Sequence, residues 1–74
     1  MNPVIITVYW EHDSTMGISA FLPGFGFDAF DSFSQLEVYC CVEYFGTQLE
    51  FVEITSEAQR QALAMQGVFY VEPF

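Results

Sequence analysis

The sequence predicts an α+β fold in which roughly four mainly antiparallel strands form a sheet with two helices on one face. Short runs of β-branched and aromatic residues alternate with Gly and Pro, and two segments carry helix start and stop signals. Hydrophobic residues make up 53% of the 74 residues, which is enough for a core. We expect one domain, residues 1–74. A chain this short buries only about 60–65% of its unfolded surface, so its stability margin should be narrow.

The first two strands are predicted to form a hairpin near the N-terminus. Residues 3–10 are rich in β-branched and aromatic side chains and are apolar on both faces, which indicates a strand inside the sheet. Residues 11–17 are polar and end in Gly, which is typical of a turn. Residues 18–22 then form the second strand. Residues 23–27 contain three helix and strand breakers, so we expect an apolar loop there.

The segment of residues 31–45 fits two structures. Ser32 or Ser34 can cap a helix, each with Gln or Glu three residues further on, and Gly46 suits the C-terminal end. Apolar residues also alternate over residues 36–44, which is typical of a strand. We favour the helix because its start and stop signals agree.

The C-terminal half is predicted to add a strand, a helix and a strand. Residues 48–54 alternate in polarity and form the first of these strands. Ser56 opens the helix with a capping box, and Gly67 follows its last residue. Residues 68–71 form the last strand, which Pro73 ends. If the first strand connected directly to the first helix, the order would be ferredoxin-like, βαββαβ, or a permutation of it.

Residues that usually carry catalysis or bind metals are few and poorly spaced. His12 is the only histidine and falls in the predicted polar turn, where no pocket would tune it. Cys40 and Cys41 are adjacent, which is too close for a relaxed disulfide, and with His12 they make a poor zinc site. We therefore expect no enzymatic activity, no metal and no cofactor. Free thiols suit a reducing cytoplasm.

The charge balance points to a basic protein as the partner. The chain has ten acidic residues and one Arg or Lys, for a net charge of −9. Affinity for nucleic acid comes largely from cationic contacts with phosphates, so we expect no direct binding to nucleic acid. Anionic membranes would repel the chain. Its longest apolar stretch, residues 17–27, falls far short of the roughly 20 residues that span a bilayer.

The acidic residues form the candidate binding surface. Arg60 can neutralise one of them, most simply Glu57 at helical i,i+3 spacing. The others must stay in water or meet the Lys and Arg of a partner. Strands and helix turns space side chains about 5–7 Å apart, similar to the spacing of charge along a nucleic acid. An ordinary solvated acidic surface is the simpler interpretation. The predicted partner-binding residues are Asp28, Asp31, Glu37, Glu43, Glu50, Glu53 and Glu57.

A second interpretation places binding in the Phe-rich segment, residues 21–33. Core filling and anchoring of the loop are the simpler explanation for its five rings. If they were exposed instead, they would dock a partner or a second copy of the chain. The protein would then be a small adaptor or a homodimeric interaction module. These rings belong to Phe21, Phe25, Phe27, Phe30 and Phe33.

In charge, size and aromatic content the chain resembles the small phage-encoded inhibitors of bacterial defence, especially anti-CRISPR proteins that act as DNA mimics. The resemblance covers the whole chain in composition, and that group shares neither a motif nor a fold. It implies a non-enzymatic inhibitor that occupies a basic nucleic-acid-binding surface of a host CRISPR complex. Its location would be the cytoplasm of an infected or host bacterium.

Overall fold

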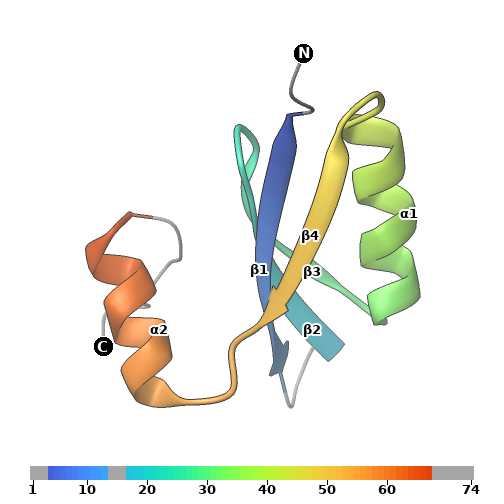
Figure 1. The fold of residues 1–74 in the computed structure, drawn as a ribbon. Coiled ribbons are helices and arrows are strands. Elements are labelled where there is room, and N and C mark those ends of the chain that lie inside the picture. Colours follow the sequence, from blue (N-terminus) through green and yellow to red (C-terminus); the bar gives the residue numbers. More distant parts are fainter. Residues whose placement is uncertain (1–3, 14–16, 68–74) are drawn as a thin grey trace.

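Residues 4–13 and 17–67, which the computed structural model describes, form a four-stranded sheet with a helix on each side (Figure 1). The elements are β1 Ile5–Asp13, β2 Gly17–Leu22, β3 Gly26–Phe30, α1 Phe33–Glu43, β4 Gln48–Glu53 and α2 Glu57–Met65. This confirms the predicted α+β class with four strands and two helices. Within the described residues, no helix is both long enough and apolar enough to cross a membrane.

The sheet has the strand order β3-β2-β1-β4 and is mixed. β1 pairs antiparallel with β2, and β2 pairs antiparallel with β3, whereas β4 pairs parallel with β1. The hairpin and the inner position of β1 are therefore as predicted. β4 is parallel because α1 carries the chain from one edge of the sheet to the other before it re-enters, as parallel connections require.

β3 lies partly in the segment that we predicted to be a loop. Only residues 23–25 form the turn, and the strand begins at Gly26. Gly24 and Gly26 have φ angles of +86° and +99°, so these glycines turn the chain into β3 and do not prevent it. β1 likewise continues to Asp13 and so extends into the segment that we predicted to be a turn, residues 11–17. The observed order is βββαβα, in which the first strand leads to a second strand and not to a helix. The predicted strand at residues 68–71 lies outside the described residues.

α1 confirms the helix prediction for residues 31–45. Ser32 is the N-cap, and its Oγ accepts a hydrogen bond from the backbone N of Gln35 at 3.3 Å. The Gln35 side chain in turn accepts from the backbone N of Asp31 at 3.2 Å. These reciprocal bonds fix the start of the helix. Leu36 and Cys40 point into the core beneath it, which consists of Val8, Ile18, Ala20, Leu22, Leu36 and Cys40.

α2 differs from the prediction that both helices share one face of the sheet. Its Leu63 packs with Ile54 against Tyr9 and Phe21, whereas Val8 packs in the core beneath α1. Neighbouring strand residues such as Val8 and Tyr9 point to opposite faces, so the helices cover opposite sides, as Figure 1 shows. The physical reason is the inner strand itself: β1 is apolar on both faces, and each face needs cover.

Candidate functional site

All seven predicted binding carboxylates are exposed, and they fall into two regions. The first region surrounds α1 and the edge strand β3, and we call it the α1–β3 acidic group. The second lies on the other edge strand, β4, and on α2. The α1–β3 acidic group consists of Asp28, Asp31, Glu37 and Glu43, and the second region holds Glu50, Glu53 and Glu57.

Within each region the carboxylates do not share a single face. Glu50 and Glu53 are three residues apart on a strand, so they point to opposite sides of the sheet. Glu37 and Glu43 are six residues apart on α1, which separates them by about 120° around the helix axis. The seven carboxylates therefore lie on several sides of the molecule and do not form one continuous array.

The cations of the described residues lie near the second region. Arg60 Nη2 is 3.2 Å from Glu11 Oε1, so the predicted pairing of Arg60 with Glu57 is wrong. Glu57 instead accepts a hydrogen bond from the Gln61 side chain at 3.0 Å. His12 Nε2 lies 3.4 Å from Glu53 Oε2. Among the ion pairs of residues 4–13 and 17–67, none involves a carboxylate of the α1–β3 acidic group.

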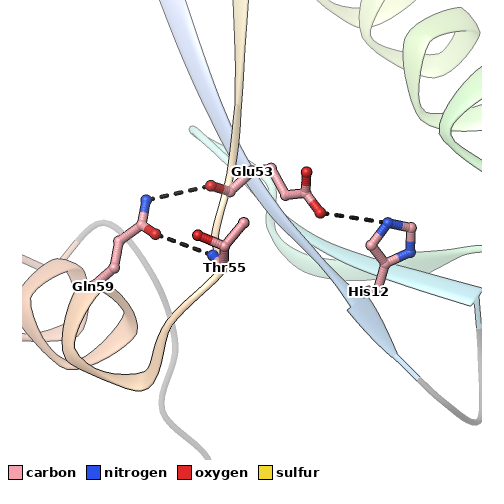
Figure 2. Close-up of polar contacts among 4 residues, drawn as sticks. All are labelled: His12, Glu53, Thr55 and Gln59. Carbon is pink, nitrogen blue, oxygen red and sulfur yellow. Dashed lines mark hydrogen bonds and ion pairs between the residues drawn. The ribbon is translucent and has the colours of Figure 1, made fainter.

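These ion pairs border a polar cleft of about 400 Å³ where the ends of β1 and β4 meet α2. His12 lies on β1 and not in the predicted turn, and its ring contacts Trp10 edge-on at 5.2 Å. Figure 2 shows the His12 ring pointing to the Glu53 carboxylate. The cleft therefore joins a histidine to a carboxylate, as an acid–base site would need. In the described part of the chain, no group of three metal-binding side chains gathers.

The hydrogen bonds around this cleft nevertheless connect structural elements. Gln59 on α2 donates to the Glu53 carbonyl at 3.3 Å and accepts from the Thr55 backbone N at 3.0 Å (Figure 2). The Ser56 hydroxyl, which also lines the cleft, accepts the N-cap bond of α2 from Gln59 N at 3.1 Å. These contacts hold α2 at the end of β4. The predicted cap at Ser56 is confirmed, but the Gln59 side chain reaches the backbone N of Thr55, one residue before the position that a capping box would use.

The outward side of α1 is apolar, a feature that the sequence analysis missed. Val38 and Val42 are one helical turn apart, and their side chains are 66% and 69% exposed. They border a groove of about 570 Å³ between α1 and β3, which we call the α1–β3 groove. The signal was available in the sequence: the valines lie on the side of the helix opposite the buried Leu36 and Cys40.

Tyr39 lines the α1–β3 groove together with Glu43. Partial burial raises the pKa of its hydroxyl, and the negative charges of Glu43 and Asp28 raise it further. Its ring packs against Phe30 with a centroid distance of 5.5 Å. Glu43 lines the groove from α1, and Asp28 lies on the same face of β3 as Phe30, which lines it from the other side.

The Phe-rich segment mainly fills the two cores. Phe30 and Phe33 pack beneath α1, and Phe21 packs against the α2 side of the sheet. Phe25 and Phe27 remain exposed. Phe25 contacts the rings of Tyr39 and Tyr44 edge-on, at centroid distances of 6.5 and 5.7 Å, and so anchors the turn before β3. Core filling and loop anchoring therefore account for most of the segment, although Phe25 and Phe27 keep exposed surface.

The two cysteines differ in environment, which predicts a difference in reactivity. Cys40 is completely buried, and burial, followed by the neighbouring Cys41, raises its thiol pKa to about 11. Cys41 is free and exposed. Because the thiolate is the reactive form, we expect iodoacetamide at neutral pH to label Cys41 and to spare Cys40 in the folded protein. Intact-protein mass should show one adduct under native conditions and two in denaturant. Equal labelling of both thiols in native buffer would contradict this placement.

No family model, curated protein or solved structure matches this chain. The α1–β3 side combines carboxylates that pair with no cation of residues 4–13 and 17–67 with an open apolar groove. The β4–α2 side holds a polar cleft whose carboxylates contact Arg60 and His12.

Proposed function

We propose that this protein is a non-enzymatic inhibitor that binds a basic nucleic-acid-binding surface of a host defence complex of the CRISPR type. One observation supports the proposal most strongly. The four carboxylates of the α1–β3 acidic group are exposed, and no described cation pairs with them. Folding a chain of net charge −9 around such groups costs stability through self-repulsion. A cationic partner would remove that cost.

The proposed mechanism is competition for the contacts that phosphates would otherwise make. The fold helps because it positions the carboxylates before binding. Asp28 Oδ1 accepts a hydrogen bond from the Ala29 backbone N at 2.8 Å, and the backbone of Asp31 is fixed by Gln35 in the α1 cap. Groups held in this way lose less conformational freedom on binding than those of a flexible polyanion. Association should be fast and sensitive to salt.

The contributions of the two regions should differ. Glu53 and Glu57 already interact with His12 and Gln61, so their carboxylates are partly satisfied within the molecule. Glu50 points to the other face of the sheet from the side that α1 covers. We therefore assign the main contacts to the α1–β3 acidic group and secondary contacts to the second region. In this proposal the protein acts in the cytoplasm of an infected or host bacterium and does not itself bind nucleic acid.

The test is capture of the partner from bacterial lysate on the immobilised protein at low salt. We expect a nucleic-acid-binding complex that is released by high salt and by an excess of duplex DNA, and whose DNA binding the protein inhibits. Neutralising the α1–β3 acidic group should prevent capture, because it removes charge with little change of shape. The variant carries Asp28→Asn, Asp31→Asn, Glu37→Gln and Glu43→Gln.

The matched control neutralises the second region with Glu50→Gln, Glu53→Gln and Glu57→Gln, and it should retain most of the capture. A captured protein that stays bound both in high salt and in excess duplex DNA would contradict the proposal. Capture that persists in high salt and is lost in the Phe25→Ala variant would instead support the second candidate function. In that case the protein is an adaptor that docks through residues 21–33. The exposure of Phe25 and Phe27 is the observation that favours this alternative.

A further inference from the structure

The α1–β3 groove has the size and composition of a binding site. Its volume of about 570 Å³ lies within the range of about 300–1,000 Å³ that is usual for ligand pockets. Phe30 and Tyr39 line it together with Val38 and Val42, the two valines that are mostly exposed. The groove is therefore a mostly apolar surface that is open to solvent.

The charges around the groove restrict what can cover it. Glu43 is part of its lining, and Asp28 lies two residues before Phe30 on the same face of β3. Among the described residues, the basic side chains Arg60 and His12 both border the polar cleft at β1, β4 and α2. The groove therefore has an apolar lining with acidic side chains beside it, and no described cation lines it.

This charge pattern disfavours a second copy of the chain as the occupant. Two copies packed through α1 would bring the same acidic side chains together, and each copy carries a net charge of −9. Like charges placed against one another across an interface cost several kcal/mol. A nucleic acid is disfavoured for the same reason. A positively charged protein segment has the complementary charge.

We propose that the α1–β3 groove binds an amphipathic basic segment of the partner protein, with apolar side chains against Val38 and Val42 and Lys or Arg against Asp28 and Glu43. This inference rests on the proposed function and adds the chemistry of the contact. The carboxylates speed association, and the apolar contact slows dissociation. Many proteins have basic surfaces, so charge alone would select poorly among them. The groove would favour a partner whose basic segment also presents apolar side chains to Val38 and Val42.

Two synthetic helical peptides provide the test, with fluorescence anisotropy as the measurement. Both carry the same Lys residues; one has Leu along the opposite side, and the other has Ser there. We expect the Leu peptide to bind at least about tenfold more tightly, a difference of about 1.4 kcal/mol. The double variant Val38→Ser/Val42→Ser should remove this preference, and it should still unfold at the wild-type temperature because both sites are exposed.

The matched control is Met65→Ser, which removes an apolar side chain that is 88% exposed on α2. It should leave the preference unchanged. Equal affinity for the two peptides, or an unchanged preference in the double valine variant, would overturn the inference. Salt-sensitive binding of both peptides with equal affinity would overturn it and still support the proposed function. Analytical ultracentrifugation could also reveal a dimer that the valine substitutions dissociate. That result would show that a second copy occupies the groove, and it would overturn the inference.

Discussion

Replacing Leu36 with alanine should lower the free energy of unfolding by about 2–5 kcal/mol. Leu36 is completely buried where α1 meets the sheet and is one of the largest side chains of that core. The substitution removes apolar contacts and leaves a cavity that the neighbours fill only in part. The expected loss is large against the roughly 5–15 kcal/mol that stabilises a typical domain.

Urea denaturation followed by tryptophan fluorescence measures this change directly. Trp10 packs against Phe33 of α1 with a centroid distance of 4.9 Å, so its emission reports on the same core. Val38→Ala on the exposed side of α1 is the matched control and should change stability by less than about 0.5 kcal/mol. Equal losses in the two variants would mean that α1 is oriented differently on the sheet.

Gly17→Ala should destabilise the protein by more than backbone strain alone. Gly17 has a φ of +92°, and a non-glycine residue in this region costs about 1–3 kcal/mol. A Cβ at this position would also lie 2.6 Å from the carbonyl oxygens of both Phe30 and Asp31. These are backbone atoms at the end of β3 and the start of the α1 cap, so the connection between β3 and α1 would have to move.

Gly24→Ala separates the two costs. Gly24 has a similar φ of +86°, and a Cβ there would meet nothing within 4 Å. Its loss of stability therefore gives the strain term, and the additional loss in Gly17→Ala gives the cost of displacing the backbone. Chemical denaturation of both variants provides the comparison. If the two variants lost equal stability, Gly17 at the start of β2 would not lie as close to the β3–α1 connection as the structure places it.

The sequence predicted the helices because their signals are local. Ser32 and Ser56 each cap a helix through a hydrogen bond from the residue three positions on, as predicted. β3 was missed because Gly24 and Gly26 were interpreted as breakers, although their positive φ angles turn the chain into the strand. The side of the sheet that α2 covers could not be predicted, since β1 is apolar on both faces and accepts a helix on either.

The candidate site was predictable in composition but not in arrangement. The shortage of Lys and Arg correctly indicated that the acids must stay in water, and all seven are exposed. Their division between two sheet edges depends on strand order, which local spacing does not determine. Arg60 pairs with Glu11 on β1, a contact between distant segments, and not with Glu57 one turn away. The exposed valines of α1 were missed because the same apolar positions had been considered as evidence for a strand.

The salt dependence of affinity for the captured partner tests the central claim most directly. We expect the affinity of the purified pair to fall steeply as salt rises, because exposed charges drive the contact. Neutralising Asp28, Asp31, Glu37 and Glu43 should weaken binding at low salt and flatten that dependence. Affinity that is the same at low and high salt, in the wild type and in the neutralised variant, would contradict the proposal that these carboxylates replace phosphates.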